Sequence, residues 1–159
     1  MFKLSTLTIA WGFLLASSTP LAWAASIAKD APAPYLTTSR SVPRNSRAPF
    51  AKYQFGLYVA GYSVSQISIG IPELMSVGSI SVRGADNEAI EASTMVEDRA
   101  AVIKFAQPVS PGTALRIQLS SVRTLSMSNK IWLLPISVQG ADTAKDLPIG
   151  MARIHTYNN

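Results

Sequence analysis

The only histidine of the chain, His155, is the first residue to consider as a catalytic base or metal ligand. A serine hydrolase combines a nucleophilic serine with a histidine and a carboxylate, and the sequence contains no G-x-S-x-G motif. One histidine without an H-E-x-x-H motif or a second histidine is also a poor basis for a zinc site. We therefore expect His155 to be an ordinary surface residue of a sheet, and we expect no catalytic residue and no metal.

The densest acidic group is Glu88, Glu91, Glu97 and Asp98. Two of these carboxylates could serve as the acid and base of a glycosidase, or several could bind calcium. Their spacing does not match a calcium loop, and a hairpin with charged turns is the favoured explanation for them. A carbohydrate-active enzyme that uses residues 88–98 is kept as an alternative to a protein without catalytic activity.

Cofactor sites have no support in the sequence. The glycines do not form a nucleotide-binding pattern, and the absence of cysteine excludes disulfides, thiolate metal sites and C-x-x-C redox chemistry.

Four aromatic residues could form a platform for sugar rings. They are Tyr58, Tyr62, Trp132 and Tyr157. Because Trp132 is in phase with Leu134 and Ile136, we expect it to pack in the core.

The net charge of +5 is unevenly distributed. From Tyr53 onward, eight basic residues are balanced by eight acidic ones, so this part is neutral and nucleic acid is not an expected partner. The excess lies earlier, in Lys3, Lys29 and a basic group that could tether the protein to an anionic surface. That group is Arg40, Arg44, Arg47 and Lys52. Without aromatic residues among them, a solvated tether is the favoured interpretation.

The first 24 residues have the three parts of a secretory signal peptide. Met1–Lys3 is basic, residues 7–15 are apolar, and Ala22-Trp23-Ala24 is an A-x-A cleavage site. We predict cleavage between Ala24 and Ala25. The apolar run is too short to span a bilayer, and no later run approaches spanning length, so the mature chain should have no transmembrane span. The predicted location is the periplasm, the cell surface or the extracellular medium.

Residues 25–52 have the composition of a linker, with four prolines among small and basic residues. From Tyr53 onward the hydrophobic pattern alternates with a period of two. Seven or eight short runs of this kind follow: 53–59, 67–71, 79–83, 90–94, 101–105, 115–119, 131–138 and 151–157. We predict an all-β domain over 53–159, an antiparallel, immunoglobulin-like β-sandwich, with a barrel as the less favoured choice. Pro135 predicts a bulge in its strand.

The region from Tyr53 to Tyr157 resembles a known family. An aromatic opening strand is followed by the turn and strand V-S-P-G-T-A-L-R-I-Q-L over 109–119, an apolar strand after a basic segment, and the closing segment G-M-A-R-I-H-T-Y over 150–157. This order is similar to the cyanobacterial secreted family called domain of unknown function 2808. The resemblance implies an exported protein of a photosynthetic bacterium and implies no activity. Residues 126–129 depart from it, since more glycine would be expected there.

These observations favour an exported, non-catalytic β-sandwich that binds or supports a component of the cell envelope. The carbohydrate-active enzyme is one alternative. Another is a module that donates or accepts an edge strand in an assembly. The ligand and the oligomeric state stay open at this stage.

Overall fold

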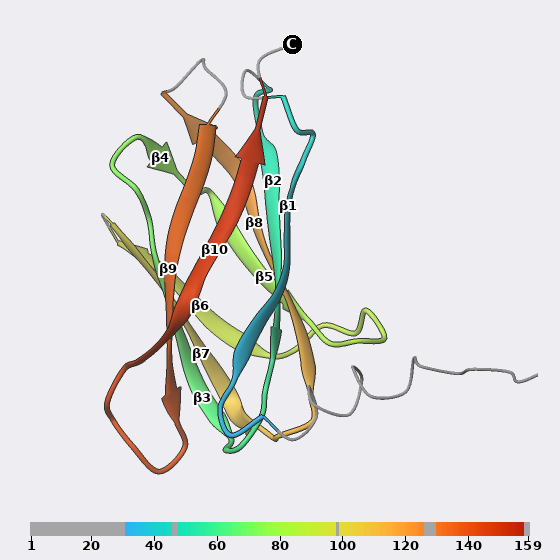
Figure 1. Ribbon diagram of the computed structural model, residues 1–159, viewed down its shortest axis with the longest axis vertical. Helices are drawn as coiled ribbons and strands as arrows, with labels where there is room; N and C mark the ends of the chain where they lie inside the picture. Colours follow the sequence, from blue (N-terminus) through green and yellow to red (C-terminus); the bar gives the residue numbers. More distant parts are fainter. Residues whose placement is uncertain (1–30, 46–47, 98, 126–129, 158–159) are drawn as a thin grey trace, which may run out of the picture.

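A computed structural model describes residues 31–45, 48–97, 99–125 and 130–157 (Figure 1). The predicted signal peptide, with Ala24 and Ala25, lies outside the described residues, as do Arg47 and Asp98.

The described chain contains ten strands and no helix. The strands are β1 Tyr35–Val42, β2 Ala51–Tyr58, β3 Val64–Gly70, β4 Met75–Ser76, β5 Ser79–Arg83, β6 Ala92–Glu97, β7 Ala100–Val109, β8 Ala114–Thr124, β9 Lys130–Gly140 and β10 Leu147–Thr156. All pairs of neighbouring strands are antiparallel. The prediction of an all-β, immunoglobulin-like sandwich is confirmed, with ten strands in place of seven or eight.

The strands form two sheets that pack face to face (Figure 1). In the first sheet β1 pairs with β2 and β2 with β8, while β4 and β5 both pair with β8. The second sheet has the order β10-β9-β3-β7-β6. Pro135 keeps a regular register opposite Met151, and the irregularity of this strand pair lies between Pro148 and Gly150 of β10. The prediction of a bulge at Pro135 is therefore wrong, and the bulge of this strand pair lies in β10.

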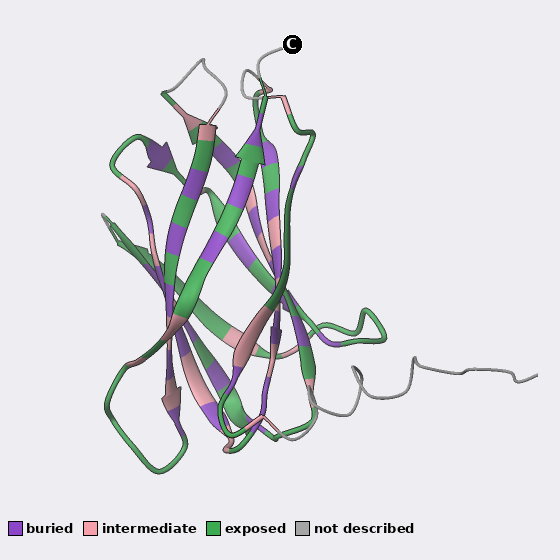
Figure 2. Cartoon of the chain, in the orientation of Figure 1, coloured by how far each residue is buried: buried purple, intermediate pink, exposed green. Residues whose placement is uncertain are grey.

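The core lies between the sheets and is filled by alternate residues of both (Figure 2). Tyr53, Phe55 and Leu57 of β2 are buried and face residues such as Ile67 and Ile69 of β3. This alternation follows from the pleat of a strand, which turns successive side chains to opposite faces. The period-two pattern that predicted the strands therefore also predicted the core.

The buried polar groups of Trp132, Thr156 and Ser41 all have hydrogen-bond partners. Trp132 is buried, and its Nε1 donates a hydrogen bond to Thr156 Oγ1 at 3.2 Å, while the Thr156 hydroxyl donates to the Lys130 carbonyl at 3.3 Å. The buried Ser41 hydroxyl donates to the His155 carbonyl at 2.8 Å. Trp132 is accordingly a core residue, as its phase in β9 predicted.

The predicted linker over 25–52 is wrong for much of its length. Residues 35–42 form β1, and β2 begins at Ala51 rather than Tyr53. β1 also links the two sheets, because it pairs with β2 while Ser41 binds the β10 backbone. Arg40 and Lys52 lie in strands of the sandwich and are not part of a tether.

Candidate functional site

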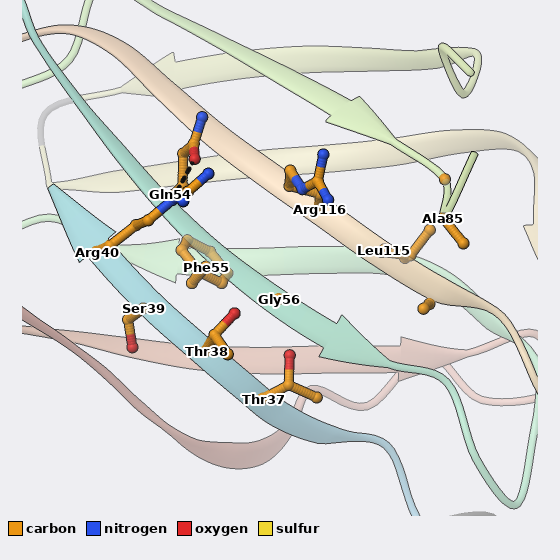
Figure 3. Close-up of a pocket in the computed structure, with 12 residues that line it drawn as sticks. Thr37, Thr38, Ser39, Arg40, Gln54, Phe55, Gly56, Ala85, Leu115 and Arg116 are labelled. Carbon is orange, nitrogen blue, oxygen red and sulfur yellow. Dashed lines mark hydrogen bonds between the residues drawn. The ribbon is translucent and has the colours of Figure 1, made fainter. Parts of the chain in front are cut away.

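A groove of about 400 Å³ crosses the outer face of the first sheet (Figure 3). It runs over β1, β2 and β8 and reaches the end of β5. Its lining residues are Thr37, Thr38, Ser39, Arg40, Gln54, Phe55, Gly56, Gly84, Ala85, Ala114, Leu115 and Arg116. Polar side chains therefore line much of this surface, although the opposite face of the same strands supplies the apolar core.

The shape of the groove depends on Gly56 and on an irregularity in β1. The register between β1 and β2 shifts between Leu36 and Ser39, and this shift places Thr37 over Gly56. A Cβ atom at position 56 would lie 2.0 Å from the Thr37 hydroxyl oxygen. A side chain at position 56 would thus displace Thr37 and alter the groove.

A chain of hydrogen bonds crosses three strands beside the groove. Arg40 Nε donates to Gln54 Oε1 at 2.8 Å (Figure 3), and Gln54 Nε2 donates to Gln118 Oε1 at 2.6 Å. Gln118 Nε2 in turn donates to Ser120 Oγ at 3.0 Å. The hydrogen bond from Nε holds the Arg40 guanidinium in place. Its two Nη groups can still donate hydrogen bonds to a ligand.

Two arginines stand directly opposite each other at the other side of the groove. Arg116 of β8 lines the groove, and its cross-strand partner in β5 is Arg83. Arg83 Nη1 donates to the Asn87 carbonyl at 2.9 Å, and within the described chain neither arginine forms an ion pair. Like charges directly opposite in a sheet are destabilising. A bound anion would remove this repulsion.

Arg40 also lines a second hollow, of about 200 Å³, where β1 meets β10. Its other lining residues include Arg44, His155 and Tyr157. The two hollows share Ser39 and Arg40, so cationic groups continue from one to the other. We call Arg44, Arg40, Arg116 and Arg83 the arginine strip.

No carboxylate is among the residues that line either hollow. The Glu88 carboxylate lies beside Gly84, which lines the end of the groove. Arginine side chains bind carboxylates, sulfates or phosphates with two parallel hydrogen bonds. The strip is therefore suited to an extended anionic ligand.

Glu91 and Glu97 of the acidic group do not lie together as a catalytic pair would. Glu91 precedes β6 and Glu97 ends it, so about six residues of extended chain, roughly 20 Å, separate them. Glycosidase carboxylates lie about 5 to 10 Å apart. In the ranges that the structure describes, no three His, Asp or Glu residues are placed to hold a metal ion.

The four aromatic residues do not form one platform. Trp132 is buried, whereas the Tyr58 ring packs on the Tyr35 ring with centroids 5.4 Å apart. Tyr58 is the cross-strand partner of Ala114, which lines the groove, so this tyrosine pair borders the groove. Tyr157 lies in the second hollow.

Sequence reasoning identified Arg40 and Arg44 as basic residues but misplaced them, and it missed Arg83 and Arg116. The last two contribute to a neutral total, which hid their position on one face. The outward position of both arginines could have been predicted from their neighbours in the sequence. Arg83 follows Val82 and Arg116 precedes Ile117, and because both of these neighbours are buried, the arginines point to the outer face. What the sequence did not provide was the pairing of β5 with β8.

The family model described as "Protein of unknown function (DUF2808)" matches residues 30–155. The chain belongs to this family, as the sequence motifs suggested. No curated protein matches the chain.

Solved structures show only a general likeness. The collagen-binding domain of a Staphylococcus aureus adhesin is 10% identical, with a TM-score of 0.44 and coverage of 77% of this chain and 97% of that chain. BslA, a bacterial hydrophobin, is 8% identical, with a TM-score of 0.44. The match covers 78% of this chain and 90% of BslA. A two-domain M1 zinc metallopeptidase is 13% identical, with a TM-score of 0.43. The match covers 64% of this chain but only 23% of that protein.

Proposed function

We propose that this protein is an exported, non-catalytic domain that binds an acidic polysaccharide of the cell envelope along the arginine strip. The observation that carries the proposal is the groove, in which Arg40 and Arg116 face an open hollow whose lining contains no carboxylate. Export is supported by the signal-peptide pattern of residues 1–24.

Polysaccharide is favoured over other anions by the groups that accompany the arginines. Thr37, Thr38 and Gln54 offer hydroxyl and amide groups to sugar hydroxyls, and the Tyr35–Tyr58 pair offers aromatic faces at the border of the groove. The strip also extends over two adjoining hollows, which suits a polymer better than a single small ion. Arginine then supplies the contacts to carboxylate or sulfate groups.

The test measures binding of the purified protein to polygalacturonate, with neutral dextran and anionic phospholipid vesicles as the other probes. We expect binding to polygalacturonate only, and a loss of about tenfold or more for the double variant Arg40→Glu/Arg116→Glu. The matched control is Lys104→Glu, an exposed change in β7 of the second sheet, which is compared with the single variants Arg40→Glu and Arg116→Glu because all three change the charge by the same amount.

If Lys104→Glu weakened the binding of polygalacturonate as much as the arginine variants do, the effect would come from net charge alone. That result would contradict a defined binding site. Binding to vesicles but not to polygalacturonate would replace the polysaccharide with a lipid surface. Absence of binding to all three probes would also contradict the proposal. For location, fractionation of cells that express a tagged protein should place it outside the cytoplasm, and full-length protein in the cytoplasm would refute export.

A further inference from the structure

The second hollow lies where β1 meets β10, and two hydrogen bonds join its two sides. The Ser41 hydroxyl donates to the His155 carbonyl at 2.8 Å. Tyr157 N donates to the Arg44 carbonyl at 2.7 Å. The fold itself therefore holds the backbone on both sides of the hollow, and the side chains that line it extend from fixed positions.

Side chains with N–H donors line this hollow from both sides. Arg40 lies in β1 and Arg44 just after it, whereas His155 lies in β10. Arg40 uses Nε for Gln54, so its two Nη groups can donate to a ligand, and an imidazole has at least one N–H donor in either charge state. No carboxylate lines the hollow, and in the described part of the chain neither arginine forms an ion pair. The hollow thus offers several donors to an anion.

The number of these donors favours a phosphate monoester over a carboxylate. A carboxylate has two oxygens in one plane, and a single arginine can bind both of them. A phosphate group has three acceptor oxygens and a charge of about −1.5 to −2 near pH 7, which matches two arginines and a histidine better. The volume of about 200 Å³, compared with about 400 Å³ for the groove, also suits one compact group.

We propose that the second hollow binds the phosphate monoester of a phosphorylated sugar, with Arg40, Arg44 and His155 as its contacts. The sugar continues from there into the groove, because Ser39 and Arg40 line both hollows. The inference rests on the proposed function only in taking a sugar of the envelope as the ligand.

The test uses His155 as its own reporter, because it is the only histidine and its Hε1 proton gives one NMR signal in a protein purified without a histidine tag. Glucose 6-phosphate, glucose 6-sulfate and glucuronate carry different acidic groups at carbon 6 of the same sugar. At a constant pH of about 7.5, we expect a saturable shift, with glucose 6-phosphate bound about tenfold or more tighter than glucuronate and also tighter than the sulfate. Equal affinities, or no shift with glucose 6-phosphate, would overturn the proposal.

Glycerol 3-phosphate separates a sugar from a lipid headgroup as the source of the phosphate. It lacks the sugar ring that would reach Ser39 and the groove, so it should bind more weakly than glucose 6-phosphate. Tighter binding of glycerol 3-phosphate would contradict a sugar ligand.

Substitutions test whether the shift comes from this hollow. Arg44→Gln should weaken the binding of glucose 6-phosphate by about tenfold, because it removes one of the two arginines. The matched control is Arg153→Gln, since Arg153 is an exposed arginine of β10 that lines neither hollow. Its loss should change the affinity by less than about threefold, because solvent screens an exposed charge that does not touch the ligand. The same loss in both variants would mean that net charge alone attracts the phosphate, and the site would be refuted.

Failure of this site can be told apart from failure of the proposed function. If polygalacturonate binds but glucose 6-phosphate leaves the His155 signal unchanged, the phosphate site is wrong and the groove stands. If glucose 6-phosphate binds in a manner that depends on Arg44 but polygalacturonate does not bind, the phosphate site stands and the proposed function is wrong.

Discussion

Tyr53 has its side chain inside the core, with 1% of its surface exposed. Burial disfavours the charged phenolate and raises the pKa of Tyr53 from 10.0 to about 12. In the unfolded chain the hydroxyl loses its proton near pH 10, whereas in the folded protein it keeps it up to about pH 12. Between these values the unfolded state binds fewer protons, so the stability falls as the pH rises.

The predicted loss attributable to Tyr53 is about 2 to 3 kcal/mol between pH 9 and 12. It is measured as the free energy of urea unfolding at a series of pH values for the wild type and for Tyr53→Phe. Other groups titrate in both proteins, so the difference between the two slopes isolates Tyr53. Parallel pH profiles would show that its hydroxyl has the same environment in both states.

At the level of single residues, the sequence predicted burial better than interaction. The phase of Trp132 placed it in the core, because alternation alone determines which face a strand residue takes. The neighbours of His155 in the second hollow were not predictable, since Arg40 and Arg44 are more than a hundred positions away in the chain. Such a cluster depends on which strands are adjacent, and alternation carries no information on that.

Among the elements, β1 is the one that the sequence did not reveal. Its burial pattern shows why, because Ser41 is its only buried residue. A strand without an apolar face lacks the alternation by which strands are recognised, and prolines on both sides of it are typical of a linker. β1 is held instead by backbone pairing with β2 and by its contact with β10.

The turn between β7 and β8 illustrates the opposite case. Pro111-Gly112 predicted a turn with glycine at a positive φ, and Gly112 has a φ of 91°. The turn joins β7 of the second sheet to β8 of the first, so the two strands do not form a hairpin. Its backbone hydrogen bonds to Val59, at 2.8 and 2.9 Å, attach it to the chain after β2.

Replacing Gly112 by valine should lower the free energy of unfolding by about 1 to 2 kcal/mol, because a β-branched residue is strained at positive φ. The space around Gly112 is open, so the cost comes from the backbone and not from a clash. Gly112→Asn is the matched control and should cost less, since asparagine tolerates this conformation. Urea unfolding of the three proteins measures the effect, and equal losses in both variants would argue against backbone strain.

At the scale of the whole molecule, the position of the charges changes the meaning of their total. With β1 and β2 in the sandwich, Arg40 and Lys52 belong to the folded domain and extend the outer face that carries Arg116. A domain that was neutral when counted from Tyr53 is therefore basic on one face. The charge of the domain thus depends on where its first strand begins, because Arg40 and Lys52 precede Tyr53 in the sequence.

Binding through exposed arginines should depend strongly on ionic strength. Salt screens interactions between exposed charges over about 10 Å at 0.1 M. The affinity for polygalacturonate should fall by about tenfold or more between 0.05 and 0.2 M sodium chloride, and titration calorimetry at each concentration measures it. An affinity that does not change with salt would mean that aromatic and hydrogen-bonding contacts dominate the complex.

The closure of the sandwich by β1 and β10 also determines how the domain would respond to tension. Asn45 and Tyr157 form a parallel bridge, so these two strands run in the same direction, and Figure 1 shows β1 starting at one end of the long axis while β10 finishes at the other. Pulling on the two ends loads the hydrogen bonds of these strands along the strand direction. The contacts from Ser41 to the His155 carbonyl and from Tyr157 N to the Arg44 carbonyl would share this load, so we expect this side of the fold to resist extension in shear.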